Sequence, residues 1–86
     1  MDTCKYIVID TAEGGPAAFM FPPFIQHVDF TRCLGFRRGD ASLLSAGFVK
    51  TTKSGLVAYG DSESLKLKAD PERDNRLLNR LLPQEK

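Results

Sequence analysis

The stretch Met20-Phe-Pro-Pro-Phe-Ile-Gln-His-Val-Asp29 decides where the chain changes direction, because it contains two consecutive prolines. Each proline holds its φ at about −65° and has no backbone N–H to donate. We therefore expect sheet pairing to stop at Pro22. The apolar residues Phe24 and Ile25 and the chain's only histidine, His27, follow this corner. Binding groups often lie on loops that a rigid scaffold holds, so the segment is a candidate contact surface.

Before the corner, the sequence predicts a β-hairpin over residues 5–21. Residues 5–10 are rich in β-branched side chains and apolar on both faces, which is typical of a buried strand. Turn residues follow at 11–16, and residues 17–21 form a second apolar run. The spacing predicts a hairpin loop longer than two residues.

After the corner, Asp29 is placed to cap a short helix through residues 30–34, which Gly35 would end with a positive φ. A second hairpin is expected from residue 41 onward, with a turn at 52–55 and a return strand at 56–60. The run Ser-Leu-Lys-Leu-Lys at 64–68 alternates strictly, which is typical of an edge strand whose lysines face water.

The C-terminal part predicts a helix with Asp70 as N-cap, Pro71 in the first helical position and Pro83 at its end. The apolar face of this helix consists of Leu77, Leu78, Leu81 and Leu82. We expect one α+β domain spanning residues 1–86. Its small antiparallel sheet of four to five strands consists of two hairpins plus an edge strand, with one short helix and a C-terminal helix packed on one face.

The composition is that of an ordinary globular chain, with 42% hydrophobic and 27% charged residues and a formal net charge of +1. No apolar run approaches the roughly 20 residues that span a bilayer, and the N-terminus lacks the pattern of a signal peptide. We therefore expect a cytoplasmic protein with no membrane partner. Cys4 and Cys33 have no metal-ligand spacing and are expected to be free thiols.

His27 and Asp29 are two residues apart, and a carboxylate that orients an imidazole is one half of a catalytic triad. The nucleophile is missing unless the fold brings Ser62 or Ser64 next to His27. No second histidine is present for a common zinc site. The sequence therefore predicts no enzymatic activity and no cofactor, and a small hydrolase using His27 and Asp29 is the third hypothesis for function.

The leading hypothesis is a non-enzymatic interaction module that binds a protein partner or forms a homodimer. One principal helix for two sheet faces is expected to leave an apolar patch, formed by residues such as Ile7, Ile9, Phe19, Phe21 and Phe24. The candidate interaction surface consists of Phe24, Ile25, His27, Asp29, Arg73, Arg76 and Arg80.

The alternative is nucleic-acid binding through the basic half of the chain, where residues 32–86 carry eleven Lys or Arg against seven acids. The lysines expected to line a sheet surface are Lys50, Lys53, Lys66 and Lys68, with Arg37 and Arg38 nearby. The near-neutral total charge and the lack of an aromatic RNA-binding pattern place this hypothesis second. Retention on heparin that falls steeply with salt would support it.

Three strings carry a resemblance: Phe21-Pro-x-x-Ile-x-His27-x-Asp29, Ser45-Ala-Gly-Phe-Val49 and Tyr59-Gly-x-Ser-x-Ser-Leu65, followed by a leucine-rich helix. Over residues 6–82 the chain resembles a group of short uncharacterised proteins of bacteria and their phages or prophages. The resemblance implies a bacterial or phage origin. It implies no activity, cofactor or catalytic residue.

Overall fold

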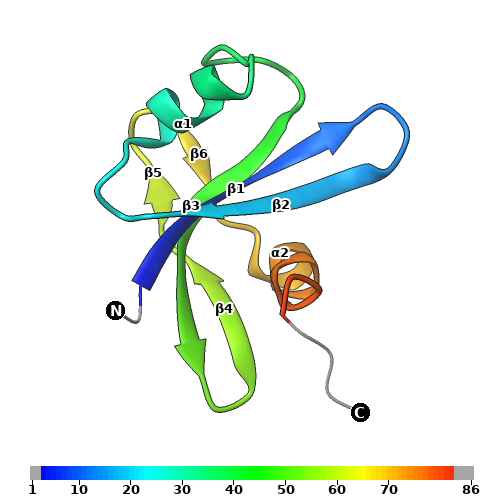
Figure 1. Cartoon of the computed structure of the whole chain (residues 1–86), viewed down its shortest axis with the longest axis vertical. Coiled ribbons are helices and arrows are strands. Elements are labelled where there is room, and N and C mark those ends of the chain that lie inside the picture. The colour runs from blue at the N-terminus through cyan, green and yellow to red at the C-terminus, as the bar shows by residue number, and fades with distance from the viewer. Residues whose placement is uncertain (1–2, 83–86) are drawn as a thin grey trace.

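Four antiparallel strands form a strongly twisted sheet in the order β2-β1-β3-β4 (Figure 1). The protein is described by a computed structural model, in which residues 3–82 are placed. The strands are β1 (Thr3–Thr11), β2 (Gly15–Phe21), β3 (Leu43–Thr52) and β4 (Gly55–Tyr59). The sheet curls into a half-barrel. The α+β class and the antiparallel sheet are therefore confirmed.

Both predicted hairpins are present. In the first, Lys5 pairs with Phe21 and Thr11 pairs with Gly15, which leaves a loop at residues 12–14. In the second, β3 and β4 pair from Phe48 with Tyr59 to Thr52 with Gly55. The strand β2 ends at Phe21, immediately before Pro22, as the missing N–H of proline requires.

The run at 64–68 differs from the predicted edge strand. Lys66 has a φ of 59°, which breaks the alternation, so only β6 (Leu67–Lys68) is extended. It pairs with β5 (Asp61–Ser62) in a separate two-stranded sheet that lies against β3. The physical reason is burial, because the turn places Leu65 inside the core.

The helix α1 (His27–Cys33) begins earlier than expected, and Asp29 does not cap it. Gln26 is the N-cap residue, and the N–H of Val28 donates to Oγ of Ser64 at 3.2 Å. Asp29 lies in the first turn, where it forms an exposed ion pair with Arg32 at 3.9 Å. The prediction of Asp29 as the cap is therefore wrong, because a residue distant in sequence supplies the acceptor.

The helix α2 (Pro71–Asn79) starts as expected, with Asp70 as N-cap residue and Pro71 in the first turn. It ends at Asn79, and Pro83 lies outside the described residues. Leu78 is fully buried against the sheet, whereas Leu81 and Leu82 follow the helix and are exposed. The packed face of α2 is thus narrower than the four leucines predicted.

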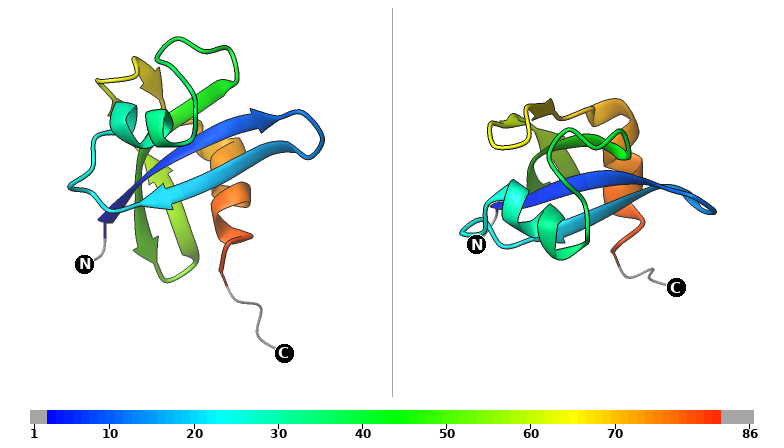
Figure 2. Two further views of the ribbon diagram at one scale, coloured as in Figure 1. Left: turned by 45° about the horizontal axis from the view of Figure 1, so that its top comes forward. Right: turned by 90° about the horizontal axis from the view of Figure 1, so that it is seen from above.

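The sheet has one core cluster on each face. On one face, Leu78 of α2 packs on a cluster consisting of Tyr6, Val8, Ala18, Val49, Leu56 and Ala58. On the other face, α1 and the β5–β6 segment cover a cluster consisting of Ile7, Ile9, Phe21, Leu43, Ala46 and Leu65. Figure 2 shows the two helices on opposite sides of the curled sheet. The expected apolar patch is therefore wrong for Ile7, Ile9 and Phe21, which are all buried.

The two edges of the sheet differ. At the β4 edge, the side chain of Asn79 accepts from the N–H of Leu56 and donates to its C=O, both at 2.9 Å. Asn75 accepts from the N–H of Ala58 at 2.7 Å. At the other edge, no strand within residues 3–82 pairs with the outer side of β2. No helix in this described range is long and apolar enough to cross a membrane.

Candidate functional site

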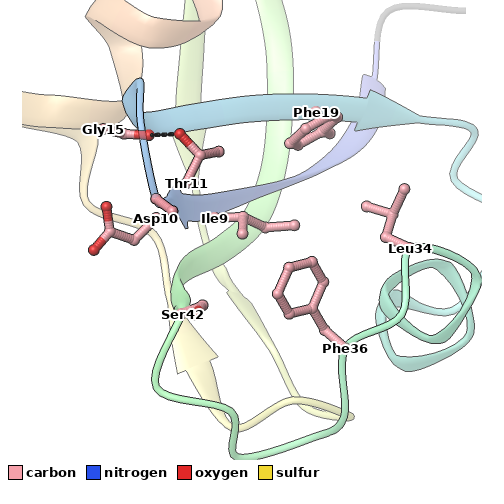
Figure 3. A pocket seen from close by; sticks show the side chains of 9 residues that line it. Ile9, Asp10, Thr11, Gly15, Phe19, Leu34, Phe36 and Ser42 are labelled. Carbon is pink, nitrogen blue, oxygen red and sulfur yellow. Dashed lines mark hydrogen bonds between the residues drawn. The ribbon is translucent and has the colours of Figure 1, made fainter.

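An open groove of about 890 Å³ lies between the tip of the β1–β2 hairpin and the loop that follows α1. We call it the hairpin groove, and it is lined by Ile9, Asp10, Thr11, Ala12, Gly15, Phe19, Leu34, Phe36 and Ser42. Figure 3 shows the side chains of Ile9, Phe19, Leu34 and Phe36 directed into a common space. Asp10, Thr11 and Ser42 form its polar rim.

The groove exists because the hairpin extends beyond the helix that covers its base. Oγ1 of Thr11 donates to the C=O of Gly15 at 2.7 Å, which fixes the hairpin tip. The N–H of Asp10 donates to the C=O of Ser42 at 2.7 Å and joins the hairpin to the start of β3. These hydrogen bonds fix the walls, so the groove is largely preformed, which is the usual state of a binding site.

The double-proline corner carries the most exposed aromatic side chain among the large hydrophobic residues, Phe24, which is 82% exposed. A shallow hollow of about 370 Å³ beside it is lined by Thr3, Cys4, Met20, Phe21, Pro22, Pro23 and Phe24. Residues 14–26, which include β2 and the corner, contain no charged side chain, and His27 follows them directly. Exposed apolar surface of this kind is typical of contact regions.

His27 is buried, with 4% of its surface exposed, and so does not add its side chain to this surface. Nε2 lies 2.8 Å from the C=O of Gly47 and must donate there, because a carbonyl oxygen only accepts. The ring lies edge-on between Phe21 and Phe48, with centroid distances of 5.3 and 5.9 Å. Burial lowers the pKa of His27 below its ordinary 6.5, and the charge of Lys5 lowers it further. His27 therefore joins α1 to β3 as a neutral imidazole.

The fold does bring Ser62 and Ser64 to the hollow of about 210 Å³ that His27 lines. The hydroxyl of Ser64 accepts from Val28, and that of Ser62 accepts from the N–H of Leu65 at 3.2 Å. The Asp29 carboxylate pairs with Arg32 and not with the imidazole. His27 and the two serines therefore line one hollow without Asp29, and their hydrogen bonds are structural ones in place of those that a triad requires.

Gly47, whose C=O accepts the hydrogen bond from His27, has no room for a side chain. A Cβ there would lie 2.6 Å from the C=O of Tyr59 and 3.3 Å from Cβ of Ala69. The absence of a side chain thus lets the backbone at the end of β4 lie close against Gly47. Nothing in the local sequence distinguishes Gly47 from an ordinary glycine in a strand, so the sequence could not predict this role.

Arg73 and Arg76 of α2 and Arg80, which follows the helix, do not form one exposed stripe. Nε of Arg73 donates to Oδ1 of Asp74 at 3.1 Å, and its Nη2 donates to Oγ of Ser45 at 3.0 Å. Arg76 and Arg80 are exposed. The head group of the half-buried Arg73 is thus occupied by acceptors of this chain, whereas the other two side chains are exposed. Ile25 is half-buried, and its C=O accepts from Nζ of Lys5 at 2.8 Å.

The lysines expected on one sheet surface lie on two different hairpins. Lys50 and Lys53 belong to the β3–β4 hairpin, where Nζ of Lys50 lies 5.5 Å from the centroid of the Tyr59 ring. Lys66 and Lys68 belong to the β5–β6 segment. Because helices and loops cover the two sheet faces, the described lysines do not line an open sheet face.

A buried polar network under α2 was not predicted. Oδ2 of Asp74 accepts from Tyr6 at 2.5 Å, from Ser45 at 2.7 Å and from the N–H of Asp70 at 3.0 Å. Burial raises the pKa of Tyr6 far above its ordinary 10, and the Asp74 carboxylate raises it further. One signal was available in the sequence, since Asp74 precedes Leu78 by four residues and shares its helix face. The network is buried, so we assign it to stability.

Comparisons with protein-family models, curated proteins and solved structures find no significant match. The bacterial or phage origin that the sequence motifs imply stays a prediction. Among residues 3–82, no three side chains of His, Cys, Asp or Glu are grouped so that they could hold a metal ion. The hairpin groove and the uncharged segment at residues 14–26 are therefore the two surface features suited to binding a partner.

Proposed function

We propose that the protein is a non-enzymatic interaction module and that its contact surface is the hairpin groove together with the open edge of β2. The observation that carries the proposal is the groove itself, where Phe19, Leu34 and Phe36 leave apolar surface uncovered at a site whose walls are hydrogen bonded. Apolar surface that a small chain leaves open in this way is typical of a protein-binding site.

The chemistry of the site favours a polypeptide as partner. The groove offers apolar contacts, and the adjoining edge of β2 offers unpaired backbone N–H and C=O groups. An extended main chain satisfies such groups by adding a strand, while its alternate side chains enter the neighbouring pocket. We therefore propose a partner segment that is extended and apolar.

Selection from a phage-displayed library of random peptides on the immobilised protein tests this proposal. We expect enriched peptides to be apolar and, once synthesised and titrated, to shift the NMR signals of Ile9, Phe19, Leu34 and Phe36. Leu34→Glu should weaken their binding by about tenfold or more, because it places a charge in the groove.

The matched control is Leu81→Glu, which changes another exposed leucine that does not line the groove. Its affinity for the selected peptides should equal that of the unmodified protein. Failure of any peptide to be enriched, or signal shifts confined to the hollow at His27, would contradict the proposal.

A further inference from the structure

We infer that the partner is a second copy of this chain, joined by antiparallel pairing of β2 with β2 about a two-fold axis at Phe19. The inference rests on the proposed function for the position of the contact surface. It goes further by naming the partner and the register.

Two observations show which residues of β2 direct their backbone N–H and C=O groups toward the open edge. The N–H of Asp10 donates to Ser42, away from β2, although Asp10 is the register partner of Pro16. Asp10 and Pro16 are therefore a non-hydrogen-bonded pair, and the backbone of Pro16 faces the open edge. Because backbone groups alternate along a strand, those of Ala18 and Met20 face the open edge as well.

The chain closes one sheet edge and leaves the other open. At β4, the side chains of Asn75 and Asn79 hydrogen bond to the outward backbone groups of Leu56 and Ala58. Natural sheets usually protect an open edge with charged side chains, above all lysine. Residues 14–26 contain none. The edge of β2 is therefore the place where this sheet can be extended.

The position of the prolines makes this edge self-complementary. Pro16 and Pro22 lie at equal distances in sequence before and after Phe19. If two β2 strands pair antiparallel about Phe19, Ala18 lies opposite Met20 of the second copy, and the two residues exchange both N–H···O=C bonds. Pro16 then lies opposite Pro22 of the second copy, so the residues without an N–H meet at the ends of the ladder.

Pairing in this register also places the second copy next to the hairpin groove. Phe19 lines the hairpin groove, and in the register above it lies directly opposite Phe19 of the second copy on the same sheet face. Opposed aromatic side chains in a non-hydrogen-bonded pair are in contact. One two-fold axis thus pairs the open backbone groups and extends apolar contact to the groove, which explains why both features occur on one hairpin.

Light scattering across a dilution series is the first measurement. We expect a mass near twice the 9.5 kDa of one chain at high concentration, falling toward one chain on dilution. In hydrogen exchange, the amides of Ala18 and Met20 should become more protected as concentration rises. This readout uses the unmodified protein and does not depend on how well a variant folds.

Opposite charges at position 19 test the register. Phe19→Glu and Phe19→Lys should each be monomeric, because each would place two like charges at the axis. Mixing the two variants should restore a dimer containing one of each. Leu81→Glu, which lies outside β2, should leave the dimer unchanged.

The outcomes separate this inference from the proposed function. A chain that stays monomeric at the highest concentration but binds selected peptides in the groove would overturn self-association and leave the interaction module standing. A dimer that both Phe19 variants still form alone would overturn the register. A dimer broken by Leu81→Glu but not by charges at position 19 would place the interface elsewhere.

Discussion

Buried polar side chains do much to connect the layers of this protein. Asp74 and Tyr6 are both 0% exposed, and the carboxylate accepts from the phenol, from Ser45 and from a backbone N–H. A buried carboxylate is costly unless hydrogen bonds or an opposite charge compensate it. Here Arg73 adds the charge at 3.1 Å. Removal of one donor should therefore lower the free energy of unfolding by more than the net contribution of one hydrogen bond, because the buried carboxylate loses a partner.

We predict that Tyr6→Phe lowers the free energy of unfolding by about 1–3 kcal/mol, because the buried carboxylate loses a donor while the aromatic packing stays. Urea denaturation measures this loss. Tyr59→Phe is the matched control, since Tyr59 is an exposed tyrosine on β4, and its loss should be near zero. Equal losses for the two variants would show that the network contributes little.

Because His27 is buried, we expect the free energy of unfolding to depend on pH. Burial holds the pKa of His27 below the 6.5 of an unfolded chain, so the unfolded state binds more protons below that pH. The stability that neutral His27 contributes is present above 6.5 and is lost as pH falls through the folded pKa. We expect the free energy of unfolding to decrease on acidification, by at most about 1.4 kcal/mol per pH unit for one group.

Urea titrations between about pH 7 and pH 5 measure this slope, before most carboxylates titrate. His27→Gln keeps an N–H donor for Gly47 and has no imidazole, and His27 is the chain's only histidine. This variant should lose the slope even if it is less stable throughout. An unchanged slope would mean that another group titrates.

At the scale of elements, α1 shows how a short helix depends on distant residues. Its seven residues are too few to be stable alone. Besides the packing of Val28 and Phe30 on the core, two hydrogen bonds hold it: Val28 donates to Ser64 between β5 and β6, and His27 donates to Gly47 of β3. The cap therefore comes from a turn that follows the helix by more than thirty residues.

We predict that Ser64→Ala lowers the free energy of unfolding by about 0.5–2 kcal/mol, the usual loss when a helix cap is removed. Asp29→Ala should change it by less, because its ion pair with Arg32 is exposed. Thermal or urea unfolding of both variants gives the comparison. A larger loss for Asp29→Ala would restore Asp29 as the capping residue.

At the scale of the whole molecule, the first strand and the last helix share one network. Tyr6 of β1 and Asp74 of α2 are 68 positions apart, and Ser45 of β3 completes the contact. The helix α2 also closes the β4 edge through Asn75 and Asn79. One face of the sheet and α2 are thus stabilised by the same contacts, because they share this network and the core cluster around Leu78.

We therefore predict one cooperative unfolding transition. Tyrosine fluorescence, which reports on Tyr6 and Tyr59, should coincide with the loss of helix and sheet measured by circular dichroism. The test is to record both signals in one urea titration at low protein concentration. Loss of helical signal before the fluorescence change would show that α2 detaches independently.

Local sequence signals predicted the elements that depend on residues close in the chain. β-branched alternation predicted the first hairpin, Pro22 predicted the end of β2, and Asp70 with Pro71 predicted the start of α2. The α+β class follows from these elements. The prediction was wrong for the cap of α1 and for the full length of the edge strand at 64–68.

The sequence by itself determined the hairpins, the corner and the C-terminal helix, because turn chemistry, proline geometry and side-chain periodicity act over a few residues. Only the tertiary structure decided the roles of Ser64, Asp74 and Gly47, and the opening of the hairpin groove. Each of these depends on a partner many positions away or on space that another element fills or leaves open. The distance between residues that are far apart in the sequence cannot be derived from local patterns. Which acceptor an N–H group such as that of Val28 binds depends on how the layers pack.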